Sequence, residues 1–401
     1  MKTENKKNLD VFKEHLGQTS DFPLSIEIEK AEGMYMFSAD GKKYLDLISG
    51  LSVNNLGHRH PAVVDAIKNQ VDKYLHVMVY GEFILKPQTD LIRLLADNLP
   101  ASLQRIYLVN SGSEAIEGAM KLAKRYSGRS EIICFEHAYH GGTQGALAMM
   151  GDEMYRQPFR PLSPDIRSIR YNEDLDLHYI SNKTACVIVE AIQAEAGIRL
   201  PSPEWMIKLR HRCNETGTLL IFDEVQTGFG RTGSLFAFER SGVIPDVLVI
   251  GKALGGGMPV AAFIASNEIM NSLKTNPVLG HITTFGGHPL CCAAAYASLK
   301  VLTSSDLIAQ VDRKHELFKQ LLVHKEIQEI RGKGLFMAIK LKNSIRVKKF
   351  LPLIREKGLM INSFIFCNDS FRIAPPLIIT DEEIRYACSI ILETLDEISI
   401  R

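Results

Sequence analysis

The chain has 401 residues, of which 47 are basic, 46 are acidic and 46% are hydrophobic. A net charge this close to zero excludes general attraction to nucleic acid or to an anionic membrane surface, so specificity must come from a site. Seven scattered cysteines without a C-x-x-C pair argue against a disulfide framework and against a zinc site. A polar N-terminus and the lack of a long apolar run predict a cytoplasmic protein.

The first 60 residues contain the pattern of a β-hairpin. Alternating residues at 34–37 precede a turn at 39–42 and a second short run at 44–47. We expect residues 1–60 to pack against the C-terminal part of the chain and to form part of a small domain.

Residues 61–302 alternate helix-like stretches with short apolar runs. Strands are predicted at 106–109, 131–135, 185–189, 219–222, 247–250 and 260–265. Helices are predicted at 61–74, 88–98, 114–126, 203–216 and 289–302, several of which begin with proline. This alternation predicts an α/β fold, a large domain whose mainly parallel sheet is covered by helices on both faces.

Residues 303–401 have a different pattern. A helix is followed by strands around 332–341 and 359–374, and a final helix is predicted at 381–398. We interpret this stretch as a small α+β domain completed by the N-terminal segment.

Three polar groups follow strands of the predicted sheet. Ser111, Gly112 and Ser113 stand where a strand leads into a helix, so backbone N–H groups and hydroxyls could bind a phosphate there. The alternative, equally favoured by the motif alone, is that Ser111 or Ser113 caps the helix.

The other two groups are a carboxylate and an amine. Asp223 ends an apolar strand, and a carboxylate there could keep a pyridine nitrogen protonated, which makes the ring an electron sink. Lys252 follows the next strand in a glycine-rich loop, where desolvation would favour its neutral, nucleophilic form. With the phosphate site, they describe a pocket for pyridoxal 5'-phosphate.

Two runs of residues resemble the motifs of class III, or ω-amino, aminotransferases. They are 219–233 (LLIFDEVQTGFGRTG) and 245–259 (PDVLVIGKALGGGMP), and similar segments occur at 57–61, 111–115, 139–141, 189–195, 283–289 and 372–376. The resemblance implies fold type I, pyridoxal phosphate as cofactor, and Lys252 as the residue that binds it as a Schiff base and transfers protons. It also assigns to the cofactor site Ser111, Gly112, Ser113, Tyr139, His140, Glu190, Asp223, Val225, Gln226 and Thr284.

The resemblance implies particular roles for several of these residues. Tyr139 and Val225 would lie on opposite faces of the ring, and Gln226 would hydrogen-bond its phenolic oxygen. In related enzymes, a threonine that matches Thr284 reaches the phosphate of the neighbouring subunit, so a homodimer is expected. Arg372 would bind a substrate carboxylate, and Glu195 would neutralise Arg372 when the reacting amine has no carboxylate beside it.

One departure from the family concerns the acceptor. Several relatives have an arginine where this chain has Gly142, and that arginine binds the distal carboxylate of 2-oxoglutarate. Arg156 or Arg160 would have to replace it, unless the acceptor differs.

The predicted function is transfer of an amino group from an ω-amine or amino acid to an oxo acid such as 2-oxoglutarate or pyruvate. One alternative is another reaction with the same cofactor, such as racemisation, aminomutation or decarboxylation. A second alternative is a binding protein that has kept the fold without the activity.

Overall fold

The computed structural model describes the backbone of residues 2–400 and the side chains of residues 8–399. Its centre is a seven-stranded sheet with the strand order β4-β10-β9-β8-β7-β5-β6. The strands are β4 (Arg105–Val109), β5 (Glu131–Phe135), β6 (Ile166–Ile169), β7 (Thr184–Glu190), β8 (Leu219–Asp223), β9 (Val247–Ile250) and β10 (Ala261–Ala265). Neighbours from β6 to β9 are parallel, whereas β10 is antiparallel to both β9 and β4. The predicted mainly parallel sheet is confirmed.

The burial of the strands and the length of their connections explain which neighbouring strands are parallel and which are antiparallel. Every residue of β7, β8, β9 and β10 is buried, as expected where helices cover both faces. Residues 251–260 join β9 to β10 without a crossover helix, so the chain turns back and the two strands are antiparallel. The edge strand β6 was not predicted, because its two central residues are exposed and break the apolar run.

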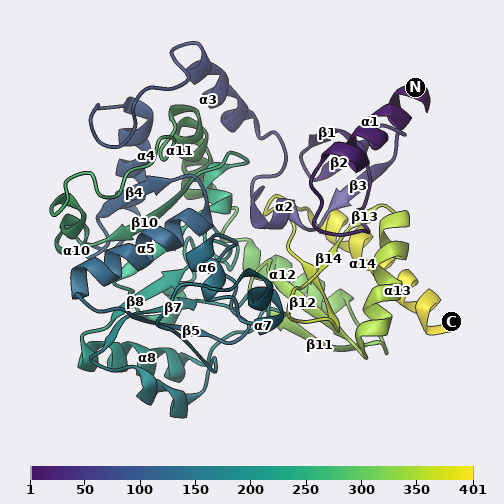
Figure 1. Ribbon diagram of the computed structural model, residues 1–401. Coiled ribbons are helices and arrows are strands. Elements are labelled where there is room, and N and C mark those ends of the chain that lie inside the picture. The colour runs from purple at the N-terminus through teal and green to yellow at the C-terminus, as the bar shows by residue number, and fades with distance from the viewer. Residues whose placement is uncertain (1, 401) are drawn as a thin grey trace.

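Five longer helices belong to the large domain (Figure 1). They are α3 (Pro61–Val71), α4 (Lys86–Asp97), α5 (Gly112–Ser127), α8 (Pro203–Thr216) and α11 (Pro289–Ser304). Helix α5 packs on β9 and β10, and α11 packs against α3 and α4. Short helices in the connections are α2 (Ser49–Ser52), α6 (Gln144–Ala148), α7 (Glu153–Arg156), η1 (Gln157–Phe159), η2 (Asp174–Tyr179), α9 (Phe238–Ser241), η3 (Lys252–Gly255), α10 (Asn267–Asn271) and η4 (Ser272–Lys274).

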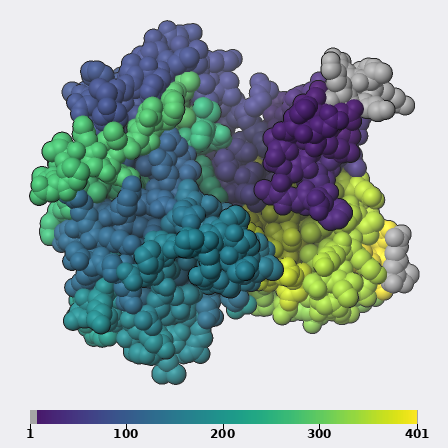
Figure 2. All heavy atoms as spheres, in the orientation of Figure 1, coloured from purple at the N-terminus to yellow at the C-terminus, as the bar shows by residue number. Residues whose placement is uncertain are grey.

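The small domain combines both ends of the chain, which lie together in Figure 1. Its first sheet contains β1 (Ile28–Glu32), β2 (Tyr35–Ser38), β3 (Lys43–Asp46) and β13 (Leu359–Met360), and its second contains β11 (Ile327–Gly332), β12 (Met337–Leu341), β15 (Ser370–Ile373) and β14 (Asn362–Ser363). Its helices are α1 (Lys2–His15), α12 (Val311–Leu321), α13 (Ser344–Glu356) and α14 (Asp381–Ile400). Figure 2 shows the purple N-terminal segment lying on the yellow-green C-terminal part. The parallel pair β3–β13 joins them, and the predicted hairpin is the antiparallel pair β2–β3.

A buried arginine connects the large domain to both segments of the small one. The Arg231 guanidinium donates to the carbonyls of Leu335 and Pro375 and to the side-chain oxygens of Ser49 and Asn55. Burial lowers the pKa of Arg231 to about 9, although the charge of a nearby aspartate opposes this effect. The four hydrogen bonds replace part of the hydration that this cation loses on burial, and the lowered pKa indicates that they do not replace all of it.

Among the helices of the described chain, none combines the length and the apolar character that a membrane crossing requires.

Candidate active site

Most of the predicted site residues meet at one edge of the seven-stranded sheet. Because β10 is antiparallel to both β4 and β9, the carboxyl ends of β4 and of the parallel strands β5, β7, β8 and β9 point the same way. The residues that follow these strands therefore converge where open α/β sheets bind their ligands. They surround a cavity of about 190 Å³ lined by Ser111, Gly112, Ser113, Tyr139, His140, Gly141, Glu190, Ile192, Asp223, Val225, Gln226, Thr227 and Lys252.

Lys252 enters this cavity from the loop between β9 and β10. Its backbone has a φ of +45°, a left-handed conformation that is uncommon for a residue with a side chain. Burial lowers the pKa of Lys252 to about 8, and the positive charge of Arg372 adds to the effect. The amine is therefore neutral far more often than an exposed lysine, which suits it to attack an aldehyde.

Asp223 is held in place by a histidine. Its Oδ2 lies 2.7 Å from His140 Nδ1, and its Oδ1 accepts the backbone N–H of Val225 at 3.0 Å. Burial lowers the pKa of His140, but the hydrogen bond and the charge of Asp223 more than offset this effect, so the pKa is raised. Each carboxylate oxygen has a second lone pair, which leaves Asp223 able to accept a hydrogen bond from the cavity.

The start of α5 fits a phosphate group. The Ser111 hydroxyl accepts the Glu114 N–H at 3.2 Å, and the Ala115 N–H bonds to the Ser111 carbonyl. The N–H groups of Gly112 and Ser113 belong to the first turn, where a helix offers no carbonyl acceptor, and they point out of its N-terminal end. A side chain at Gly112 would lie 2.8 Å from a methyl of Val225, so the backbone itself faces the cavity. Ser111 caps the helix, as one interpretation of the motif predicted, and the phosphate site at Gly112 and Ser113 stays a prediction.

Gly141 shows how closely the adjoining loop approaches this end of α5. It has a φ of +130°, and a Cβ there would overlap the Ser113 hydroxyl at 1.8 Å. That hydroxyl accepts the N–H of Gly142 at 2.9 Å. The loop therefore fixes the rotamer of Ser113 at the cavity wall.

Glu190 braces the loop that carries Tyr139. One of its carboxylate oxygens accepts the Tyr139 N–H at 3.1 Å, and the other accepts the Ala194 N–H at 2.9 Å. Burial raises the pKa of Glu190 to about 7. Tyr139 and Val225 also line the cavity, and their contact with the faces of a cofactor ring stays a prediction.

Arg372 and Glu195 form an ion pair next to the cavity. Arg372 Nη2 lies 2.5 Å from Glu195 Oε1, and both side chains are nearly inaccessible to solvent. Arg372 Nη1 also donates to the Oε1 of Gln226 at 3.3 Å, and Gln226 lines the cavity. The guanidinium stacks on the ring of Phe364, which sequence reasoning did not single out.

Besides Arg372 and Glu195, three further predicted residues are not part of the cavity lining. Thr284 is exposed on the loop before α11, in a single chain. Arg156 and Arg160, the two candidates for a second carboxylate anchor, both pair with Glu153, at 2.9 and 2.6 Å. A Cβ at Gly142 would meet open space, so no neighbouring side chain fills the place where relatives carry an arginine.

The chain matches the family model described as aminotransferase class-III over residues 17–395. It is 38% identical over 388 residues to an acetylornithine aminotransferase of Methanopyrus kandleri, covering 96% of this chain and 97% of that protein. It is 36% identical to a LysW-aminoadipate semialdehyde/glutamate semialdehyde transaminase of Sulfolobus acidocaldarius, covering 92% of this chain and 95% of the relative.

Solved structures lead to the same family. An ornithine aminotransferase from Toxoplasma gondii, described with partial occupancy of pyridoxal phosphate at its active site, superposes with a TM-score of 0.91 at 28% identity. The match covers 99% of this chain and 95% of that one. The alternatives of a silent binding protein and of a different reaction class are thereby set aside. The chain belongs to the class III aminotransferases, enzymes of fold type I that use pyridoxal 5'-phosphate to transfer amino groups.

Proposed function

We propose that this aminotransferase takes its amino group from the terminal amine of an N-acetylornithine-like ω-amino acid and passes it to an oxo acid. The observation that carries the proposal is the buried pair between Arg372 and Glu195. Because Glu195 neutralises the charge of Arg372, the reacting carbon of the substrate does not need a carboxylate to pair with this arginine. The acetylornithine aminotransferases among the relatives support this choice of donor.

The same pair supports a second state for the acceptor. An oxo acid carries a carboxylate beside its carbonyl, and a bidentate guanidinium is the best protein partner for that group. We propose that Glu195 moves away when an oxo acid enters, so that Arg372 can bind its carboxylate. The pair would then act as a gate between the two half-reactions.

The roles proposed for the remaining residues follow from their positions. Bound pyridoxal phosphate supplies an electron sink for the carbon that loses a proton. Lys252 would hold the cofactor and move that proton, and Asp223 would keep the ring nitrogen protonated. The N-terminal end of α5, with Gly112 and Ser113, would hold the phosphate.

We also propose a homodimer in which Thr284 of one subunit reaches the cofactor phosphate of the other. Thr284 is exposed, and the loop around it carries exposed apolar residues such as Ile282 and Phe285. The Phe285 ring lies 5.0 Å from that of His76, in a neighbouring segment that exposes Phe83 and Ile84. Apolar side chains gathered in this way are typical of a protein interface. Sedimentation at decreasing protein concentration, with cofactor occupancy followed in parallel, tests whether occupancy falls with the dimer.

A substrate panel tests the reaction. N-acetylornithine, ornithine, 4-aminobutyrate, lysine, putrescine and β-alanine are each combined with 2-oxoglutarate and with pyruvate, and the amino acid formed from the acceptor is quantified. We expect N-acetylornithine to give the highest kcat/KM. A preference for donors whose reacting amine stands beside a carboxylate would contradict the proposed role of the Arg372–Glu195 pair.

A further inference from the structure

The loop that carries Glu195 contacts two arginines of the second sheet of the small domain. The first is Arg372, which binds Glu195, and the second is Arg331. Arg331 on β11 is opposite Ala338 on β12, and Ala338 is opposite Arg372 on β15. Residues paired across a sheet in this way project to the same face. The small domain therefore presents two arginines, two strands apart, to one loop of the large domain.

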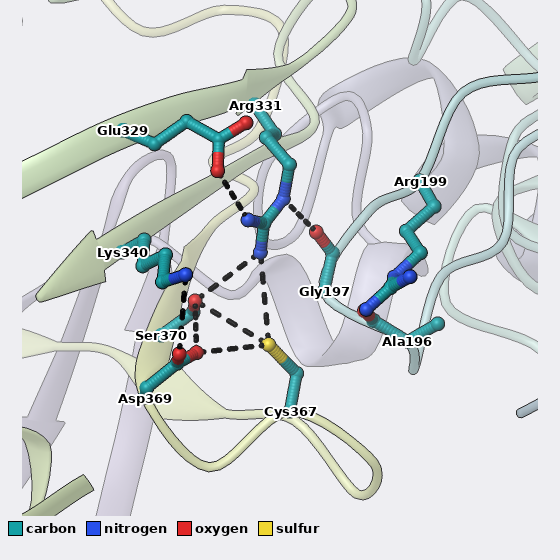
Figure 3. A network of polar contacts seen from close by, with 9 residues as sticks. All are labelled: Ala196, Gly197, Arg199, Glu329, Arg331, Lys340, Cys367, Asp369 and Ser370. Carbon is teal, nitrogen blue, oxygen red and sulfur yellow. Dashed lines mark hydrogen bonds and ion pairs between the residues drawn. The ribbon is translucent and has the colours of Figure 1, made fainter. Parts of the chain in front are cut away.

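The two arginines contact the loop two residues apart. Arg372 binds the Glu195 carboxylate, and Arg331 Nε donates to the Gly197 carbonyl at 3.0 Å (Figure 3). Ala338 lies between them and belongs to a buried cluster with Ala194 and Ile198 of the loop. A small residue at this position lets the loop lie close against the sheet.

Arg331 also fixes the segment on the other side of Glu195. Its Nη2 lies 3.3 Å from Ser370 Oγ and 3.6 Å from Cys367 Sγ. Dashed lines mark both contacts in Figure 3. The segment before Cys367 donates two backbone N–H groups to Glu195, from Ile365 to the carboxylate and from Phe366 to the carbonyl, each at 3.1 Å. One guanidinium thus holds both chain segments that position Glu195.

Close packing at Gly197 shows that this contact is specific. Gly197 has a φ of +86°, and a Cβ there would lie 2.5 Å from Cys367 Sγ and 2.8 Å from Arg331 Nη2. A side chain would separate the loop from the guanidinium. The contact therefore depends on the backbone conformation of the loop that carries Glu195.

We propose that Arg331 is a positioning residue that sets the balance of the gate by holding Glu195 against Arg372. This inference rests on the proposed gate function of that pair. Without Arg331, Glu195 is less ordered in its paired position, so Arg372 is free more often. Oxo acids then bind more tightly, and the ω-amine donor reacts less efficiently because it meets an unpaired cation.

The test compares the two half-reactions in single turnovers, with N-acetylornithine added to the pyridoxal phosphate form of the enzyme and 2-oxoglutarate added to its pyridoxamine phosphate form. For Arg331→Met we expect kcat/KM to fall about five- to tenfold for the donor and the KM for the oxo acid to fall by a similar factor, a coupling of ordinary size. Equilibrium binding of glutarate, which cannot react, should tighten in parallel. Arg331→Lys keeps the charge but not the forked geometry, and should shift both values in the same direction by less.

Matched controls separate positioning from general damage. Arg199→Met removes an exposed arginine of the same loop whose hydrogen bond, to the Ala196 carbonyl, stays within the loop. Glu329→Gln weakens a different contact of Arg331, its ion pair with Glu329, which involves neither of the two segments that position Glu195. Both should leave the ratio of the half-reactions unchanged. Equal losses in both half-reactions for the Arg331 variants, or a ratio that does not change, would overturn the proposal.

A Glu195→Gln background distinguishes the two levels of the inference. If Glu195→Gln does not alter donor and acceptor preference, the gate itself is wrong. If it does alter preference while Arg331→Met and Arg331→Lys do not, the gate stands and the role of Arg331 is wrong. If both hold, the Arg331 substitution should add little in the Glu195→Gln background, since the two residues act on one equilibrium.

Discussion

Lys252 should capture pyridoxal phosphate at neutral pH much faster than an ordinary lysine. Burial, aided by the charge of Arg372, lowers its pKa to about 8. Near pH 7 an amine with that pKa is neutral in about one molecule in ten, against about one in three thousand for an ordinary lysine. Since the neutral amine is the nucleophile, we expect a gain of about 300-fold in reactive amine.

The assay follows covalent attachment of added cofactor to cofactor-free enzyme across a pH series. Samples are reduced with borohydride at timed intervals, and the modified Lys252 peptide is quantified by mass spectrometry. Rates are divided by those of a free lysine analogue, which cancels the ionisations of the cofactor itself. For an amine whose pKa is lowered, the rate rises with pH and becomes level above about pH 8, well before the analogue does.

Substitution of Arg372 tests the cause of the lowered pKa. Arg372→Gln removes a cation and leaves Glu195 without it, so the pKa of Lys252 should move upward. Each unit of such a shift lowers the rate near neutral pH about tenfold. Arg199→Gln, in an exposed position, serves as the control and should not alter the profile. A wild-type rate that rises in parallel with the free analogue to about pH 10 would falsify the reasoning.

Three further outcomes follow from the site. Asp223→Asn should lower the rate of proton removal by several orders of magnitude while the peptide modified at Lys252 still forms, because a neutral amide would no longer keep the ring nitrogen protonated; a loss under tenfold in single turnovers would exclude that role. Gly142→Arg should lower the KM for 2-oxoglutarate about tenfold and leave that for pyruvate unchanged, since the new side chain enters open space and can bind a second carboxylate. Thr284→Ala should weaken pyridoxal phosphate binding about tenfold, measured by equilibrium dialysis, with the dimer intact in sedimentation; unchanged affinity would remove Thr284 from the site.

Much of the large domain could be predicted from the sequence because local pattern and burial agree there. The strands at 131–135 and 247–250 have the predicted bounds, since continuous apolar runs end where the chain leaves the sheet. Helix α8 also has the predicted bounds, with Ser202 as N-cap and Gly217 in a left-handed conformation after its last residue. Helix α1, by contrast, was not predicted, because its first turns are polar and its apolar residues are limited to Leu9, Val11 and Phe12.

In the candidate site, too, local sequence patterns predicted some residues, whereas contacts between distant segments could not be predicted. Lys252 and Asp223 could be predicted because each follows an apolar strand and belongs to a recognisable motif. The contact between His140 and Asp223 spans 83 residues of sequence, and no local pattern encodes it. The hydrogen bond from Arg331 to the Gly197 carbonyl could not be predicted from the sequence either. It depends on the strand register that places Arg331 and Arg372 on one face of a sheet.

The buried Arg231 has a consequence for how the protein is made. Its partners come from the beginning, middle and end of the chain, and the Ser49 hydroxyl that it contacts also donates to the carbonyl of Ala374, 325 residues away. During synthesis, residues 49 and 55 leave the ribosome long before their last partners exist. The N-terminal segment therefore stays incompletely paired until nearly the whole chain has been translated, and during this interval the nascent chain is exposed to misfolding.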